Sequence, residues 1–477
     1  MAPVCSAQEA AKRPPNILFL MADDLNTRLG CYGDEMVKSP RLDSLASRGA
    51  RFDRAYCQFP LCGPSRNSML TGRYPDSTGI HANSQIFRQT IPEAVSLPQA
   101  YRRDGWFAAR IGKMYHYNVP KSVGTVGHDD PASWELTIQP AGVDRVDEEG
   151  DIFSLREGEF GGTLSWYASP RGSEFHTDAI MAKDAAWVLE RCAREPQRPF
   201  FLAVGFFRPH TPYVSPKSYF EHYPLEKISL VQGVDKDQQD IPPLALASRK
   251  PEQEKLTDDL RRQAIQAYFA SITFMDEQVG LVLDSLKRLG LEENTIVVFT
   301  SDHGYHLGEH GLWQKQSLFE ESARVPLLMA GPGVKPGTSI GAPVGLIDIY
   351  PTLRKMTGHG SSEPLQGQNL VPMLEDPTTT GRGYALTQVK RGNISGWSIR
   401  TTRWRYIEWD NGTKGAELYD HDNDAGELTN LAADPAHAAT LAELTTRLRE
   451  SAATTRPASG RIPEVIPETW PPNLLGR

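Results

Sequence analysis

The sequence predicts an α/β protein in which helices cover both faces of a large, mostly parallel sheet. Two kinds of segment alternate along the 477 residues. Short runs that are apolar at every position are typical of strands buried on both faces. Stretches with apolar residues three and four positions apart separate these runs and are typical of amphipathic helices. This alternation favours a parallel sheet between two layers of helices.

Four apolar runs are predicted as buried strands, and they cover residues 16–22, 200–205, 295–300 and 326–330. Helical spacing predicts helices over residues 177–195, 258–289 and 438–451, and a further helix from Tyr350 that closes at Gly358. No apolar run approaches the roughly 18 residues that a membrane-spanning helix needs. We therefore expect no membrane span.

A change in composition at residues 376–381 (Asp-Pro-Thr-Thr-Thr-Gly) predicts a linker. It would separate a large domain, residues 15–375, from a smaller antiparallel α+β subdomain, residues 382–477, with strands within 397–409 and 417–419. Residues 1–14 form an N-terminal segment. Its small residues up to Ala7 resemble the end of a secretory signal, which predicts a periplasmic or secreted protein. An ordinary N-terminal tail is the alternative.

The charge balance excludes one class of partner. Lys and Arg number 51 against 59 Asp and Glu, giving a net charge of −8. Such a chain lacks the positive field of a nonspecific nucleic-acid binder. An anionic substrate would have to be attracted by a local cluster of basic residues. The five cysteines are too few for a disulfide framework.

Carboxylates follow two of the predicted strands. Asp23 and Asp24 come directly after the first strand, and Asp302 follows the third. Ligands in α/β sheets bind beyond the carboxyl ends of the strands. Adjacent buried acids are costly unless a cation neutralises them, and oxygen ligands favour calcium or magnesium. Asp23 and Asp24 could instead cap the next helix, but the second acid at a second strand end favours the metal.

Residues 61–73 read Leu-Cys-Gly-Pro-Ser-Arg-Asn-Ser-Met-Leu-Thr-Gly-Arg. Pro64 fits the first turn of a helix, which places Cys62 at the helix N-terminus, where backbone N–H groups favour anions. Arg66 adds a positive charge one turn later. A tyrosine-phosphatase loop would need Arg at the position of Ser68, and a nucleophile elbow would need Gly at the position of Asn67. A buried structural cysteine is the alternative.

The pattern Cys-x-Pro-Ser-Arg followed by Leu-Thr-Gly-Arg resembles the signature of the type I, formylglycine-dependent sulfatases. Other motifs occur in the order of that family over nearly the whole chain: Asp23-Asp24, Gly112-Lys113 with His116, Arg208-Pro209-His210, Ser301-Asp302-His303-Gly304, Gly308-Glu309-His310-Gly311 with Lys315, residues 347–352, and residues 417–420. Within the family, the chain is most similar to the iduronate-2-sulfatase group, through residues 29–33, residues 112–116 and the Asp302-His303 pair.

The resemblance implies an alkaline-phosphatase-like fold and a sulfatase activity. It implies that a formylglycine-generating maturation enzyme oxidises Cys62, and that Asp23, Asp24, Asp302 and His303 hold one divalent cation that the modified Cys62 also contacts. Calcium is expected. Magnesium or manganese stays open, because imidazole is a less typical ligand for a hard cation.

The resemblance also implies roles for the basic residues. Arg66 would orient the formylglycine hydrate, and Lys113 and Lys315 would bind sulfonyl oxygens. His210, with or without Lys315, would be the acid for the leaving alcohol, and His116 the base for the collapse of the sulfated intermediate. His306 and His310 are left out of the site.

The expected substrate is a sulfated carbohydrate, namely a 2-O-sulfated uronate of a polysaccharide or oligosaccharide. A phosphonate monoester or phosphodiester hydrolase with the same fold is one alternative. A catalytically inactive carbohydrate-binding relative is another, and the complete set of acids, Cys62, Arg66 and basic residues argues against it.

Overall fold

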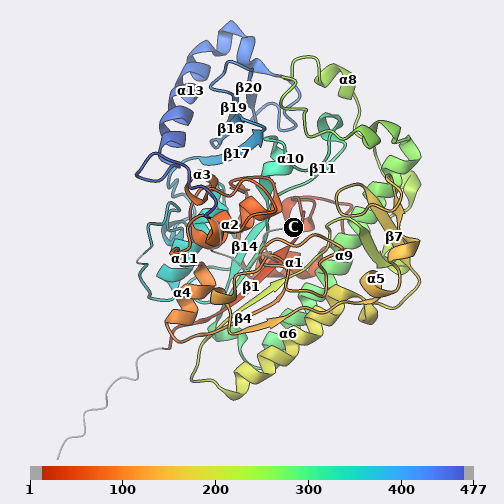
Figure 1. The fold of residues 1–477 in the computed structure, drawn as a ribbon, viewed down its shortest axis with the longest axis vertical. Coiled ribbons are helices and arrows are strands. Elements are labelled where there is room, and N and C mark those ends of the chain that lie inside the picture. The colour runs from red at the N-terminus through yellow and green to blue at the C-terminus, as the bar shows by residue number, and fades with distance from the viewer. Residues whose placement is uncertain (1–12, 362, 467–477) are drawn as a thin grey trace, which may run out of the picture.

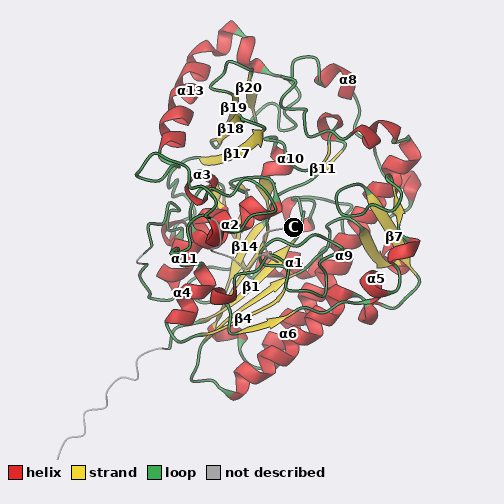
Figure 2. Cartoon of the chain, viewed as in Figure 1, coloured by secondary structure: helices red, strands yellow, loops and turns green. Residues whose placement is uncertain are grey.

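A computed structural model describes residues 13–361 and 363–466 of the chain. Its centre is an eight-stranded sheet with helices on both faces (Figure 1, Figure 2). In spatial order the strands are β15 (Thr338–Ile340), β2 (Gly49–Phe52), β14 (Leu327–Ala330), β10 (Thr295–Ser301), β1 (Asn16–Ala22), β8 (Phe200–Gly205), β4 (Phe107–Gly112) and β5 (Leu136–Ile138). The signal-like segment that ends at Ala7 lies outside the described residues.

The predicted fold class is confirmed, because most strand pairs of this sheet are parallel. Strand β1 is paired in parallel with β10 and β8, and β4 is paired in parallel with β8 and β5. Only β14 runs antiparallel, to β10 and to β2. The register places Ala22 beside Ser301 and Gly112 beside Gly205. The segments that follow β1, β10, β4 and β8 therefore leave the sheet at one edge.

The two faces of the sheet are buried by different helices. Leu18 and Leu20 of β1 lie in the core formed with α1, α6 and α9, whereas Ile17 and Phe19 lie in the core formed with α2, α4 and α11. This alternation follows from the two-residue period of a strand. The longer helices are α1 (Pro40–Ser47), α2 (Cys62–Thr71), α4 (Leu97–Arg103), α6 (Thr177–Arg194), α9 (Asp258–Arg288), α11 (Ile349–Met356) and α13 (Ala438–Ala453).

Strand β4 was not expected, because Arg110 makes its sequence look like part of an amphipathic segment. The strand is buried throughout, and Arg110 is fully buried with it. An ion pair of 2.6 Å with Asp129 compensates the buried guanidinium. A charged residue inside a strand thus hid an element that local hydrophobicity would otherwise have revealed.

The C-terminal part of the chain forms a separate four-stranded antiparallel sheet (the blue region of Figure 1). The predicted strand region 397–409 is two strands joined by a turn, and a preceding strand adds a fourth. The strands are β17 (Ala385–Arg391), β18 (Ile394–Arg400), β19 (Trp404–Trp409) and β20 (Ala416–Asp420). The division of the chain at residues 376–381 into two domains stays a prediction.

This C-terminal sheet supports a loop of the larger part of the chain. One face packs on α13 through residues such as Ile399 and Leu448. The other face packs on residues 312–319 through Ile407 and Trp409. The C-terminal sheet therefore forms the platform for the loop that carries Lys315.

A buried ion cluster joins this sheet to α10 (Glu320–Ala323) and to the loop before it. Arg405 of β19 is fully buried, and it donates hydrogen bonds to Glu320, to Glu427 and to the Leu318 carbonyl at 2.9 Å. Burial opposes ionisation of Glu427, but Arg405 and His421 outweigh it and lower its pKa to about 2. Arg405 is therefore the one cation that both carboxylates share, and Arg400 adds to the compensation of Glu320 and His421 to that of Glu427.

We predict that Arg405→Ala lowers the free energy of unfolding by about 3 kcal/mol, because it removes the ion-pair partner that two buried carboxylates share, while only His421 remains beside Glu427 and Arg400 and Arg324 beside Glu320. Arg403→Ala is the matched control. Its ion pair with Asp420 involves an arginine that is 48% exposed, so water already screens the pair and the loss should be small. Guanidinium denaturation of both variants measures the difference. Equal midpoints would contradict a structural role for the buried cluster.

Candidate active site

The candidate site lies at the edge of the large sheet where four strands end. Asp23 and Asp24 follow β1, and Asp302 and His303 follow β10. Lys113 follows β4, and the loop after β8 carries His210. The parallel register brings these segments together, and all six side chains are almost completely buried. The structure thus brings together Asp23, Asp24 and Asp302, the strand-end acids that the sequence analysis grouped; their role as a site stays a prediction.

Cys62 faces this edge from the first residue of α2. Leu61 before it is extended, and Pro64 stands in the first turn of the helix, as expected. The Sγ atom lies 3.2 Å from Lys315 Nζ, 3.3 Å from His303 Nε2 and 3.7 Å from Asp24 Oδ1. Burial opposes a thiolate, but the positive charges of Lys113, Lys315 and His303 outweigh it and hold the pKa of Cys62 well below its usual value. Residue 62 is therefore placed where a negative charge is stabilised.

Arg66, one turn further along α2, connects the acids of two strands. Its Nη2 donates to Asp23 Oδ1 and its Nε to Asp302 Oδ2, each at 2.9 Å. Its Nη1 donates to the Lys113 carbonyl oxygen at 2.7 Å. The guanidinium is fully buried, so one side chain fixes the ends of β1, β10 and β4 relative to each other.

The two lysines neutralise the remaining carboxylate oxygens. Lys113 Nζ lies 2.6 Å from Asp23 Oδ2, and Lys315 Nζ lies 2.6 Å from Asp24 Oδ1. Burial nevertheless exceeds the effect of Lys113 and raises the pKa of Asp23 to about 6. The pKa of Asp302 is instead held below its usual value, because Arg66 and His303 outweigh the effect of burial. Asp23 is therefore the acid whose charge is less fully compensated.

One group of donors fits a divalent cation. Asp24, Cys62, Asp302 and His303 each offer a ligand atom, and these atoms lie within 4.8 Å of one another. His303 Nδ1 donates to the Gly304 carbonyl at 2.9 Å, which leaves Nε2 directed at the acids, as in metal-ligating histidines. Burial disfavours a charge on His303, yet Asp302 and Asp24 raise its pKa to about 9. The same carboxylates would attract a metal ion. Asp23 lies beside this group, in a second set with Asp24 and His210.

The backbone of Asp24 takes a conformation that is rare for a non-glycine residue, with φ of 64°. Tyr268 of α9 donates to its carbonyl oxygen at 2.8 Å, and Asp302 accepts from its N–H at 3.1 Å. Tyr268 therefore positions a candidate ligand. The sequence analysis missed it, because nothing in an amphipathic helix distinguishes a tyrosine that packs from one that orients a loop.

The two candidate proton-transfer residues differ in environment. Burial lowers the pKa of His116 to about 4, so its imidazole is neutral at pH 7 and able to accept a proton. His210 Nδ1 donates to the Thr211 carbonyl at 2.5 Å, and Nε2 lies 3.8 Å from Asp24 Oδ2. This arrangement directs Nε2 of His210 toward the candidate metal site.

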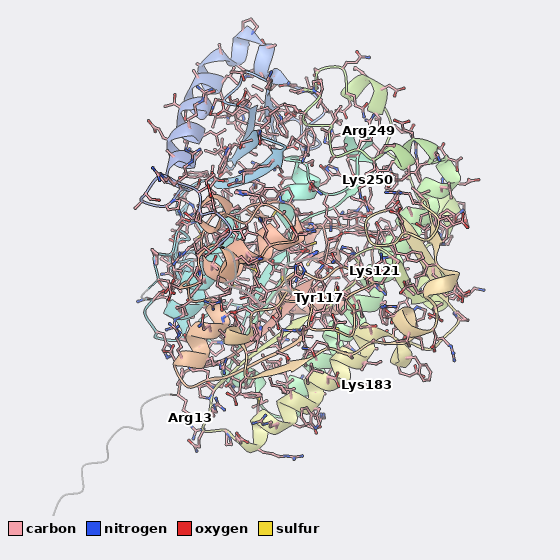
Figure 3. All side chains as sticks on the ribbon, in the orientation of Figure 1. Arg13, Tyr117, Lys121, Lys183, Arg249 and Lys250 are labelled. Atoms are coloured by element: carbon pink, nitrogen blue, oxygen red, sulfur yellow. The ribbon has the colours of Figure 1, made fainter. Side chains whose placement is uncertain are left out.

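A pocket of about 410 Å³ opens onto His116, His210 and Lys315. Segments far apart in the sequence form its wall: Leu61, Asn83, residues 116–119, Lys121, residues 160–162, His210, Ser248, Lys250 and residues 313–316. Figure 3 labels Tyr117, Lys121 and Lys250 of this wall. The sequence analysis did not identify Lys250, because a lysine next to Pro251 in a loop has the features of any surface residue.

His306 and His310 lie apart from these groups. His310 Nδ1 is 3.0 Å from Asp237 Oδ2, and its ring stacks on Phe319. Cys57 and Cys192 are buried, and Cys31 is only partly buried. Within the described part of the chain, no helix combines the length and the apolar character needed to cross a bilayer.

Comparison with known proteins identifies the family. Residues 15–359 match the sulfatase family model, and residues 308–454 match the model for the C-terminal region of N-sulphoglucosamine sulphohydrolase. A sulfatase of Formosa agariphila is 34% identical, with 88% of this chain and 83% of that protein covered. Mouse iduronate 2-sulfatase is 31% identical (88% and 89% covered), and the choline-sulfatase of Rhizobium meliloti is 32% identical (88% and 83% covered).

Among solved structures, the phosphonate monoester hydrolase of Agrobacterium radiobacter superposes with a TM-score of 0.78 at 23% identity, with 92% of this chain and 96% of that chain covered. This likeness concerns the fold alone. The family match spans most of the chain, and the relatives are aligned over most of their own length. The chain therefore belongs to the sulfatase family and is a sulfuric ester hydrolase with the alkaline-phosphatase-like fold.

Proposed function

We propose that this sulfatase releases sulfate from a sulfated carbohydrate and that residue 62, oxidised to formylglycine, is its nucleophile. The position of Cys62 carries the proposal. It lies at a helix N-terminus, within 3.7 Å of Asp24, His303 and Lys315, where an attacking oxygen and a transferred sulfuryl group would both meet positive charge.

An unmodified Cys62 thiolate is poorly suited to this reaction. Its covalent adduct with the sulfur of the substrate would have no easy internal route to break down and release sulfate. A hydrated formylglycine supplies two hydroxyls, one to attack sulfur and one whose loss of a proton expels sulfate. The proposal requires a maturation enzyme that recognises the segment around Cys62. It also includes export to the periplasm or the medium, the prediction made from the residues before Ala7.

Asp23, Asp24, Asp302 and His303 would hold the cation together with modified residue 62. Calcium suits the oxygen-rich donor set best, and magnesium or manganese is the alternative. When bound, the cation would lower the pKa of the attacking hydroxyl and polarise a sulfonyl oxygen.

The remaining residues of the candidate site would stabilise negative charge or transfer protons. Arg66 holds the two strand-end acids and lies beside residue 62, so it keeps the nucleophile in register with the metal ligands. Lys113 and Lys315 would bind sulfonyl oxygens. His210, whose Nε2 is directed at the site, would protonate the leaving alcohol, with Lys315 as the second candidate. Neutral His116 would take the proton in the collapse step.

For the sugar, we propose a 2-O-sulfated uronate. The similarity to iduronate 2-sulfatase over 88% of the chain supports this choice, as does a pocket of a size typical for small-molecule sites. A screen of defined sulfated oligosaccharides for released sulfate tests it. Preference for a phosphonate monoester or a phosphodiester over a sulfate ester with the same leaving group would overturn the substrate assignment.

Cys62→Ala should abolish release of sulfate while leaving the fold intact, because alanine cannot be oxidised to formylglycine. Turnover of an aryl sulfate and circular dichroism measure the two quantities. Mass spectrometry of the wild-type peptide should show sulfur and two hydrogens replaced by one oxygen. Full activity of the variant would mean that another residue is the nucleophile.

Removal of divalent cations with a chelator should abolish turnover, and calcium should restore it. Inductively coupled plasma mass spectrometry of the purified enzyme identifies the ion present. An enzyme that contains no stoichiometric metal and keeps its activity in chelator would rule out the proposed ligand set.

Arg66→Lys should lower turnover by about 100-fold or more, because one ammonium group cannot replace a guanidinium that spans two carboxylates. Arg73→Lys is the control, since Arg73 lies near the end of the same segment and is paired with Glu363 instead. Steady-state kinetics on an aryl sulfate compares them. Near wild-type turnover of Arg66→Lys would show that positive charge alone suffices at this position.

A further inference from the structure

We propose that the pocket contains a second anion site, built around Lys250, that binds a carboxylate of the substrate next to its sulfate. The inference deepens the proposed function, on which it rests, by naming a residue that selects sulfate esters with a second negative group.

The first argument is the charge of the pocket wall. Its cationic side chains are Lys121, Lys250 and Lys315, two histidines (His116 and His210) stand beside them, and none of the lining residues is an aspartate or glutamate. The whole chain carries a net charge of −8. The positive character of the pocket is therefore a local feature, and such a cleft attracts anions.

The second argument is the state of the Lys250 ammonium group. Its hydrogen-bond partners are neutral oxygens, the Gly162 carbonyl and Gln314 Oε1. Among the described residues, no carboxylate lies within ion-pair distance of it. Burial and the nearby Lys315 lower the pKa of Lys250 to about 8. A partly buried cation without a counter-ion is costly, and a bound anion would supply the missing charge.

The third argument is the position of Lys250 relative to the reacting groups. Lys250 contacts the side chain of Gln314, whose chain neighbour Lys315 reaches Asp24 and Cys62. The two ammonium groups are close enough for the charge of Lys315 to lower the pKa of Lys250. Lys121, on a different segment of the pocket wall, is exposed and forms no ion pair with the described residues.

These observations favour a substrate with two anionic groups a short distance apart. The sulfate would meet Lys113 and Lys315, and the second group would meet Lys250, with Lys121 adding long-range attraction. A uronate that carries a sulfate on its own ring has this charge pattern. A sulfate ester with a quaternary ammonium group would be repelled by the same lysines.

The test compares a 2-O-sulfated uronate oligosaccharide with its carboxyl-reduced counterpart, in which a neutral hydroxymethyl group replaces the carboxylate. Each compound competes against an aryl sulfate reporter, so an inhibition constant is obtained even for a compound that is not turned over. For the wild type we expect the acid to bind about 10 to 100 times more tightly than the reduced compound. Lys250→Met should remove most of this ratio, and Lys250→Arg should restore it.

Lys183→Met is the matched control, because Lys183 is exposed and donates only to the Glu174 carbonyl; it should leave the ratio unchanged. A merely structural role of Lys250 would weaken both compounds equally in Lys250→Met, and that result overturns the proposal. The proposal is also overturned if the wild-type enzyme binds both compounds equally or binds neither of them. Release of sulfate from the oligosaccharide is measured separately. If the enzyme hydrolyses the aryl sulfate but releases no sulfate from the oligosaccharide, the proposed carbohydrate substrate is wrong. The ratio of the two inhibition constants still decides whether the second anion site exists.

Discussion

The site depends on how three buried carboxylates are kept together at the ends of two neighbouring strands. Asp23, Asp24 and Asp302 would repel one another in a region without water. Arg66 prevents this by bridging Asp23 and Asp302 at 2.9 Å each, and the lysines compensate the outer oxygens. Because Arg66 and residue 62 share one turn of α2, the same helix sets the acids and the proposed nucleophile in register.

Several parts of the fold hold this arrangement rigid before any substrate arrives. Helix α2 is buried along its whole length, so Cys62 cannot move away from the acids without disturbing the core. Tyr268 of the long helix α9 secures the unusual backbone of Asp24. The C-terminal sheet supports the loop of Lys315 through Ile407 and Trp409. Such preorganisation lets charged groups stabilise a transition state without reorganising during the reaction.

The charge of the pocket wall is opposite in sign to the net charge of the whole chain. Over the whole surface, an excess of acidic residues gives the negative net charge. Inside the pocket the sign is reversed, since three lysines and no carboxylate line its wall. The pocket thus offers an anionic ester a positive wall next to residue 62. In the proposed function, Lys113 and Lys315 would belong to the reacting centre, whereas Lys250 would extend the positive region toward the sugar.

The sequence by itself determined the central strands and the acids that follow them. Continuous apolar runs mark β1, β8 and β10, and the motif around Cys62 marks the start of α2, because these signals are local along the chain. Only the tertiary structure decided the rest. Strand β4 was hidden by Arg110, whose charge is compensated by Asp129, and the roles of Tyr268 and Lys250 depend on groups more than sixty residues away. Contacts of that kind leave no local pattern, since they are made by packing, not by spacing along the sequence.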